Sequence, residues 1–290
     1  MRRSLFLSQL TAGAAVALWS SAYVFTKVAL GYYSVSALAL LRCAVASVCL
    51  GTVLVLQRKS FPGAAAVPLF FVSGAAGFAL YILAFNKGSE TLNPTTCCIL
   101  ISTAPIITAL LARVWFRETL ARLQWAAICM AFCGILVMTL WDGELAVSGG
   151  AFWALAAAVL MSVYNIVQRF LTRRFEPLLV TAYSFFAATL LLAPFLPEAV
   201  AEIRGAAAPQ VWLVVFLGIC PSAAAYLLWA KALSLAPSTG SVANYLFLTP
   251  FLALLLEYVV TGGLPGGATF VGGAVIMASL VVFLRAGRRG

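Results

Sequence analysis

Charged side chains inside long apolar runs are the first candidates for chemistry in this sequence. Arg42 lies eight residues into the run 34–56, about 12 Å deep at ~1.5 Å per helical residue. Glu257 lies near the end of the run 238–261. A charge at the centre of a bilayer costs about 2.5–3.5 kcal/mol on insertion scales, so such residues usually have a function. Three roles are open to Arg42: it could attract the carboxylate of a ligand, pair with Glu257 or fix helix packing. Because ion pairing is the common fate of such residues, a structural role is favoured.

Polar and aromatic side chains also recur at helical spacing in six of the apolar runs. Residues three or four apart share one face of a helix. Aromatic walls with a few hydrogen-bonding groups are typical of small-ligand sites, so these faces predict a substrate cavity. Alternatively, Ser and Thr bond across helices, and Tyr and Trp anchor helices at membrane interfaces, as expected for Tyr32, Tyr33, Trp115, Trp141 and Trp212. The predicted substrate-binding residues are Trp19, Ser20, Tyr23, Phe78, Tyr81, Thr95, Cys98, Ser102, Tyr164, Asn165, Gln168, Tyr226, Trp229, Asn244 and Tyr245.

Covalent and metal chemistry find little support in the residue types. The chain has no histidine, no Asp in any apolar run, and no nucleophile elbow or phosphate loop. Its seven cysteines all lie in apolar runs, where we interpret them as small core hydrophobes, including Cys129 and Cys133 at i,i+4. A zinc site requires more ligands. We therefore expect no catalytic residues, no metal and no cofactor, which leaves a membrane-embedded enzyme as the alternative from another class.

The composition indicates the class of protein that must position these side chains. Of 290 residues, 64% are hydrophobic and only 9% are charged, whereas soluble domains carry about 25% charged residues. Apolar runs of about twenty residues, each long enough to cross a hydrocarbon core of ~30 Å, follow one another along the chain. The start "MRRSLFLSQL" is similar to a twin-arginine signal, but the apolar run continues to about Leu30 and is too long for one. The sequence therefore predicts an integral membrane protein.

Turn signals and charges divide the chain into ten predicted spans. They are 9–31, 34–56, 67–86, 94–114, 121–141, 148–168, 178–197, 210–231, 238–261 and 266–285. With the N-terminus inside, fourteen Lys and Arg residues fall on the inner side and three on the outer side. This positive-inside bias predicts that both termini are cytoplasmic. It also explains the net charge of +10 without a nucleic-acid partner, which would need a basic soluble face.

The two halves of the chain resemble each other. "YILAFNKGSETLNPTTCCILISTAP" (81–105) and "YLLWAKALSLAPSTGSVANYLFLTP" (226–250) place Tyr81 on Tyr226 and Pro105 on Pro250, at an offset of 145. Each half holds five spans, an odd number, so the second half enters the membrane upside down. The predicted fold is all-α, with ten transmembrane helices in two inverted repeats (1–145 and 146–290) around a central cavity. We expect the paired prolines to kink helices beside that cavity; the alternative is that each only adjusts packing.

The run "LWSSAYVFTKVALGYYSVSALALLRCAVA" (18–46) resembles the opening of EamA-type exporters of the drug/metabolite transporter superfamily. Such proteins show a Trp-small-small start, a Lys late in span 1 and an Arg in span 2, which here are Trp19-Ser20-Ser21, Lys27 and Arg42. The likeness extends over the whole chain. It departs from the family at the ends of spans 4 and 9, where 117–118 is Arg-Glu and 262–263 is Gly-Gly.

The resemblance implies a secondary transporter of the bacterial inner membrane that exports amino acids and other small metabolites by alternating access. In length and span pattern the chain is similar to the aromatic amino-acid exporter branch. A multidrug or nucleotide-sugar carrier of the same fold is the alternative. Since Glu257 is the only acid inside a span, a neutral, zwitterionic or anionic cargo is favoured, and proton coupling has no support.

The expected partners are a small-molecule substrate and the lipid bilayer. The last span carries small residues at helical spacing, Ala268 with Gly272 and Ala274 with Ala278. Such faces let transmembrane helices approach closely, either between two copies of the chain or within one copy. The sequence thus leaves both a monomer and a dimer open.

Overall fold

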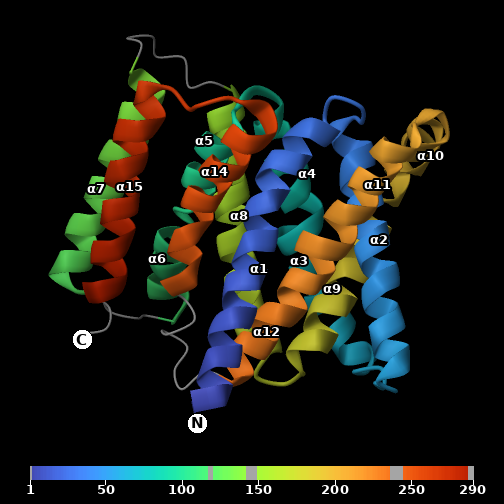
Figure 1. The fold of residues 1–290 in the computed structure, drawn as a ribbon. Coiled ribbons are helices and arrows are strands. Elements are labelled where there is room, and N and C mark those ends of the chain that lie inside the picture. Colours follow the sequence, from blue (N-terminus) through green and yellow to red (C-terminus); the bar gives the residue numbers. More distant parts are fainter. Residues whose placement is uncertain (1, 117–119, 142–148, 236–243, 287–290) are drawn as a thin grey trace.

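The computed structural model describes residues 2–116, 120–141, 149–235 and 244–286, and within these ranges all regular structure is helical (Figure 1). The elements of the first half are α1 (Arg2–Ala29), α2 (Val35–Leu56), η1 (Ala64–Ala66), α3 (Val67–Gly74), η2 (Ala75–Ala79), α4 (Leu80–Thr91), α5 (Pro94–Ile101), α6 (Ala104–Phe116) and α7 (Arg122–Leu140). Those of the second half are α8 (Gly149–Leu171), α9 (Pro177–Leu191), η3 (Ala193–Phe195), α10 (Leu196–Gly205), α11 (Ala208–Leu217), η4 (Gly218–Ala224), α12 (Ala225–Leu235), η5 (Asn244–Leu248), α14 (Thr249–Thr261) and α15 (Gly267–Ala286).

Each of the ten predicted spans overlaps one helix or a series of helices, although residues 238–243 of the ninth span lie outside the described part of the chain. Six of these are long and apolar enough to cross a membrane by themselves, or seven if the bent pair α9–α10 counts as one. The helix α1 has the length but is more polar, and the apolar parts of α7 and α14 are shorter. The protein is therefore a multi-pass helical membrane protein, while ten crossings stay a prediction.

Local sequence explains where several of these helices start and stop. Ser34 caps α2 by accepting a hydrogen bond from the backbone N–H of Ala37 (3.2 Å), and Asn93 caps α5 in the same way through Thr96 (3.1 Å). Gly262 ends α14 with φ +68°, a left-handed conformation in which glycine has no Cβ to clash. Polar caps thus mark the turns between apolar runs.

Two π-helical turns interrupt the third and eighth predicted spans at matching positions. The turn η2 separates α3 from α4, and the turn η4 separates α11 from α12. Gly77 in η2 and Ser222 in η4 are 145 residues apart, which is the offset of the repeat. π-Turns are rare and occur mostly at functional sites, so this pair directs attention to the surrounding residues.

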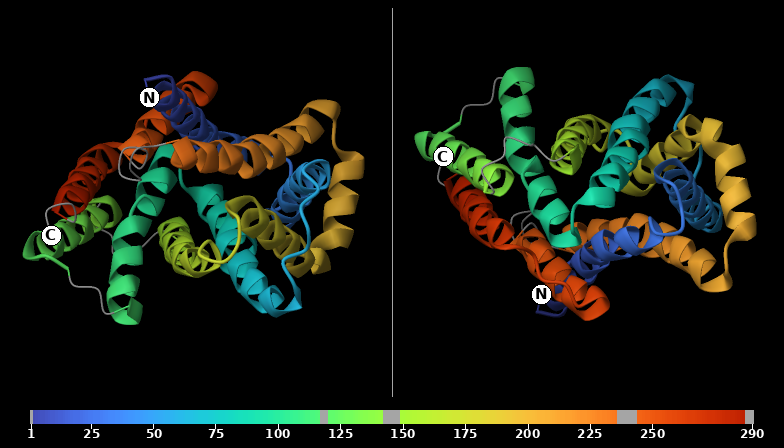
Figure 2. Two further views of the ribbon diagram at one scale, coloured as in Figure 1. Left: turned by 90° about the horizontal axis from the view of Figure 1, so that it is seen from below. Right: turned by 90° about the horizontal axis from the view of Figure 1, so that it is seen from above.

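The helices form two opposed groups, which Figure 2 shows from both ends of the bundle. In one group α1 packs on α12 and α14, and in the other α8 packs on α4, α5 and α6. The pair α2 and α9 closes one side of the bundle, and the pair α7 and α15 lies at the opposite side. The first span of each half therefore packs on the third and fourth spans of the other half.

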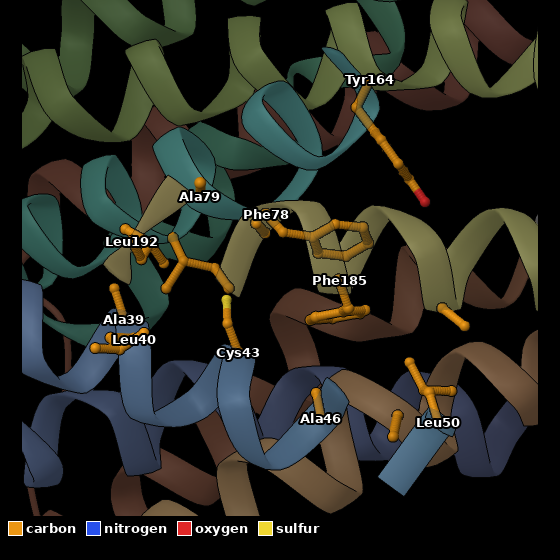
Figure 3. Packing of buried hydrophobic residues seen from close by; sticks show 14 of the residues in the cluster. Ala39, Leu40, Cys43, Ala46, Leu50, Phe78, Ala79, Tyr164, Phe185 and Leu192 are labelled. Carbon is orange, nitrogen blue, oxygen red and sulfur yellow. The ribbon is translucent and has the colours of Figure 1, made fainter. Parts of the chain in front are cut away.

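Buried aromatic rings fill the space where η2, α8 and α9 meet. Phe78 stacks on Phe185 with ring centroids 3.8 Å apart and meets the edge of Tyr164 (Figure 3). A Cβ on Gly77 would lie 2.2 Å from the ring of Tyr164, so only glycine permits this approach. The absence of a side chain at Gly77 thus makes room for an aromatic ring from the other half of the chain.

The structure corrects several sequence interpretations. The predicted span 178–197 ends early, because the chain bends by 52° between α9 and η3–α10, at the segment that contains Pro194. Cys129 and Cys133 are exposed and are not core residues, since α7 packs mainly on α15. Tyr33 is buried and is no interfacial anchor.

The small residues of α15 divide between two faces. Gly272 is buried, and a Cβ on Gly134 of α7 would lie 2.8 Å from its carbonyl oxygen. By contrast, Ala274 and Ala278 are exposed. Packing within one chain therefore accounts for the position of Gly272.

Candidate functional site

The paired prolines follow breaks in their helices. The chain leaves helical geometry at Ser102 and Thr103 before Pro105, and it changes from η5 to α14 directly before Pro250. Each proline stands at the second position of the helix that follows, where a missing N–H leaves no intrahelical bond unmade. The breaks therefore divide spans 4 and 9 near their middles.

Two serines join these breaks to the opposite halves. The hydroxyl oxygen of Ser20 in α1 lies 3.2 Å from the carbonyl oxygen of Thr249 in α14. The hydroxyl of Ser162 in α8 donates to the carbonyl oxygen of Ala104 in α6 at 2.9 Å. Both carbonyls belong to the residue before the proline. Each half thus repeats the same contact with the other half.

Most of the predicted aromatic residues form one continuous band between the two groups of helices. Trp19 of α1 lies 5.3 Å from Tyr226 and 5.2 Å from Trp229, both in α12. Tyr226 lies 5.6 Å from Phe78, which in turn contacts Tyr164. The structure therefore brings together five predicted residues from both halves.

A second group of rings adjoins this band. Tyr23 of α1 meets the edge of Phe85 at 5.2 Å, and Tyr81 lies parallel to Phe85 at 6.1 Å. Tyr23 also interacts electrostatically with the thiol of Cys98 in α5. Elements of spans 1, 3 and 4 thus meet at these rings.

Arg42 joins the two groups of rings. Its guanidinium is buried, with the residue 6% exposed, and it interacts electrostatically with the phenols of Tyr81, Tyr226 and Tyr23. Its Nε donates to the hydroxyl of Ser222 at 2.7 Å, and that hydroxyl donates to the carbonyl oxygen of Leu217 at 2.8 Å. Arg42 is therefore fixed against the π-turn η4.

Two buried polar atoms in this region have no hydrogen-bond partner among the described residues. They are Nη1 of Arg42 and the phenol oxygen of Tyr164. In Figure 3 the ring of Tyr164 lies beside Phe78, and its oxygen points past that ring. Buried polar groups are normally paired, so these two atoms require an explanation.

Glu257 does not pair with Arg42, contrary to one expectation. Its carboxylate accepts hydrogen bonds from the backbone N–H (2.8 Å) and the hydroxyl (2.5 Å) of Thr95, at the start of α5. Nearby, the ammonium of Lys27 donates to the carbonyl oxygens of Ser89 and Glu90, both at 2.8 Å. These contacts tie α14 and α1 to the turn between α4 and α5. Thr95 therefore lies in this polar cluster, at the end of the bundle that contains the turn between α4 and α5. It does not belong to the aromatic band.

The remaining predicted residues lie beside the band or apart from it. Ser102 donates to the carbonyl of Cys98 in its own chain segment, and Asn165 donates to Thr108 of α6 at 3.3 Å. Gln168 is half-buried near the end of α8. Tyr245 packs with Trp229 against α1, whereas the side chain of Asn244 lies outside the described part of the structure.

One groove on the protein surface lies apart from the aromatic band. It has a volume of about 410 Å³ and lies between α2, α9 and α10, and apolar residues such as Leu41 and Phe186 line it. It contains none of the predicted site residues. In the described part of the chain, no three Cys, Asp or Glu side chains gather as metal ligands would.

Sequence reasoning missed three features of this site, which are the contact of Ser222 with Arg42, the role of Gly77, and Phe185. Ser222 and Gly77 precede Tyr226 and Tyr81 by four residues, so the repeat placed them in register. That register was the available signal, but π-turns themselves leave no mark in the apolar periodicity. Phe185 lies in a long apolar run where nothing distinguishes it from its neighbours.

Comparison with known proteins agrees with the arrangement of paired halves. The model of the EamA-like transporter family matches twice, over residues 7–140 and 148–285. The chain is 33% identical over 273 residues to a "Probable terminal-alkyne amino-acid exporter" of Streptantibioticus cattleyicolor, covering 93% of this chain and 91% of that one. It is 26% identical to an uncharacterized transporter of Bacillus subtilis, covering 91% and 87% of the two chains.

A solved structure described as "Crystal structure of protein" shares the fold. It superposes with a TM-score of 0.62 at 22% identity, over 98% of this chain and 99% of that chain. The family resemblance read from the sequence is thus confirmed, and with it a small-molecule substrate and a location in a membrane. The chain belongs to the EamA-like transporter family, with one family domain in each half.

Proposed function

We propose that this protein is a secondary transporter that exports amino acids and related small metabolites across the bacterial inner membrane by alternating access. The observation that carries the proposal is the exchange of first spans between the halves. Each first span packs on the third and fourth spans of the other half, and Ser20 and Ser162 make matched hydrogen bonds there. Two such units can rock about the aromatic band between them.

The halves are proposed to be inverted repeats, residues 1–145 and 146–290. The family domain occurs twice, and the offset of 145 relates the π-turns and the proline breaks. In Figure 1 the start of α1 and the end of α15 lie at the same end of the bundle, which supports an even number of crossings. Arg58 and Lys59 follow α2 at that end, which fits a cytoplasmic side. Accessibility labelling is expected to find both termini on the cytoplasmic side; opposite sides would refute the inverted arrangement.

Amino acids are proposed as cargo because the aromatic band offers stacking surfaces with scattered hydroxyls, and because one relative is named as an amino-acid exporter. Purified protein in liposomes loaded with labelled amino acids should release them. Unlabelled phenylalanine, tryptophan, threonine and the terminal-alkyne amino acid propargylglycine are the competitors. Flux of a cationic dye without flux of any amino acid would favour the multidrug alternative and refute the proposed cargo.

The position of the site is tested by two tryptophan variants. Trp229 lies in the band, 5.2 Å from Trp19, whereas Trp212 in α11 is 69% exposed. Trp229→Ala should reduce transport by up to about tenfold, since an aromatic pair of this kind is worth on the order of 0.5–1.5 kcal/mol. Trp212→Ala, its matched control, should leave transport near the wild-type rate. Equal effects of the two variants would remove the band as the substrate site.

A further inference from the structure

Arg42 carries a charge that the described chain leaves partly unpaired at the centre of the molecule. No carboxylate among the described residues lies within ion-pairing distance of its guanidinium. Ser222 satisfies Nε, but Nη1 has no partner. Removing a charge from water without a partner costs several kcal/mol, so a fold that retains one there has a reason to do so. A purely packing role would be served as well by an apolar side chain of similar length.

The second unpartnered group, the phenol of Tyr164, belongs to the same cluster of rings as Tyr226, because both rings contact Phe78. The phenol of Tyr164 interacts electrostatically with that of Tyr226, which also interacts with the guanidinium of Arg42. Tyr226 therefore interacts with both groups that contain a polar atom without a partner among the described residues. Together they present a cation and hydroxyl groups from α2, α8 and α12, and so from both halves of the chain. Within this set, the guanidinium of Arg42 and the phenol of Tyr226 interact and form a pair of donors that matches the two oxygens of one carboxylate.

Apolar surface adjoins this polar set on two sides. Trp19 packs against Tyr226 from α1, and Phe78 packs against both Tyr226 and Tyr164. A solute with a carboxylate at one end and an apolar side chain would match both parts. A cationic drug would instead meet the positive charge of Arg42 without a neutralising acid.

We propose that Arg42 binds the carboxylate of the transported solute through Nη1, while the phenol of Tyr226 hydrogen-bonds to the same carboxylate. This inference rests on the proposed transport function and narrows its substrate class to carboxylates. The bond from Nε to Ser222 holds the guanidinium plane, so the site is preorganised before the solute arrives. Because η4 approaches α2 closely at Gly218, movement of the second half would carry Ser222 away and weaken this grip.

The first test requires only the wild-type protein. L-Phenylalanine and L-phenylalaninamide have the same side chain and amino group, and only the former has a carboxylate. Binding is followed by tryptophan fluorescence, because Trp19 and Trp229 adjoin the site, and transport is followed by competition in proteoliposomes. The acid should act at a concentration about ten to a hundred times lower than the amide, as expected for a hydrogen bond to a charged group. If only water binds at Arg42, the acid and the amide should act at equal concentrations, which would overturn the proposal.

The second test changes the arginine. Arg42→Gln should remove most of the preference for acid over amide, and Arg42→Lys should retain part of it. Arg285→Gln, at the exposed end of α15, is the matched control and should keep the full preference. An Arg42→Gln protein that still prefers the acid tenfold would overturn the proposal. If this variant does not fold, the wild-type comparison of acid and amide decides alone.

The outcomes separate this proposal from the proposed function. If the wild-type protein binds and transports the acid and the amide equally, the role of Arg42 fails while amino-acid export stands. If liposomes show no binding or flux of any amino acid, both proposals fail together. Preference for the acid that is lost only in the Arg42 variants supports both.

Discussion

The two π-turns have the same place in each repeat but different chemistry. In η2, Gly77 has no side chain, and the ring of Tyr164 lies against its backbone. In η4, the equivalent Ser222 carries a hydroxyl that accepts a hydrogen bond from Arg42. Each partner comes from the opposite half of the chain. One substitution in a duplicated backbone therefore exchanges an aromatic contact for a polar one.

This difference shows how a symmetric scaffold can acquire a site with two unlike ends. The backbone geometry of the π-turns is common to both halves, so it reflects the duplication. The side chains at the matched positions are not constrained by that geometry and have diverged. As a result two groups of unlike chemistry, the phenol of Tyr164 and the guanidinium of Arg42, both interact electrostatically with Tyr226. The asymmetry suits a solute whose own two ends differ.

The largest expected effect comes from a substitution in the first π-turn, η2. Gly77→Ala should destabilise the protein by about 3 kcal/mol, the upper end of the usual range for overpacking, because its Cβ would meet the Tyr164 ring at 2.2 Å. The measurement is the thermal unfolding midpoint in detergent. Gly51→Ala is the control, since its Cβ would find ordinary contact with Phe186 at 3.5 Å. If both variants unfold at the same temperature, the close approach of η2 and Tyr164 is wrong.

A smaller effect is expected in the second turn. Ser222→Ala should cost about 1.5–2 kcal/mol, because Nε of Arg42 would lose its neutral partner while the arginine stays buried. A double-mutant cycle with Arg42→Met measures the coupling between the two residues through their unfolding midpoints. Ser47→Ala, which removes a bond to Thr189 at 2.8 Å, is the control without a charge. Additive effects of the Ser222 and Arg42 changes would contradict the contact.

The smallest effect tests the serine hydrogen bond that each half makes to the other half. Ser20→Ala and Ser162→Ala should each cost about 0.6 kcal/mol, the average for hydrogen bonds between transmembrane helices. We expect the two losses in the unfolding midpoint to be equal. Ser21→Ala is the control, because Ser21 donates only to Leu18 in its own helix. A loss at one serine alone would show that the halves do not repeat this contact.

Much of the fold was readable from the sequence because bilayer insertion imposes simple rules. Apolar runs of helical length located the described helical spans, although α1 begins earlier than predicted and the chain bends after α9. The repeat of tyrosine and proline at an offset of 145 located the positions that the structure places at π-turns and helix breaks. The sequence did not predict which side chains contact one another. Arg42 faces η4, and Glu257 faces α5, because helix rotation and packing set those partners.

The sequence by itself determined the class, the spans and the duplication of this protein, since hydrophobic length and internal similarity are properties of the chain alone. Only the tertiary structure decided which atoms meet and which do not. Nη1 of Arg42 and the phenol oxygen of Tyr164 have no partner among the described residues, because the packed helices bury both atoms without placing a hydrogen-bonding group beside them. Such an omission is a property of the assembled bundle, because each residue in isolation would be paired with water.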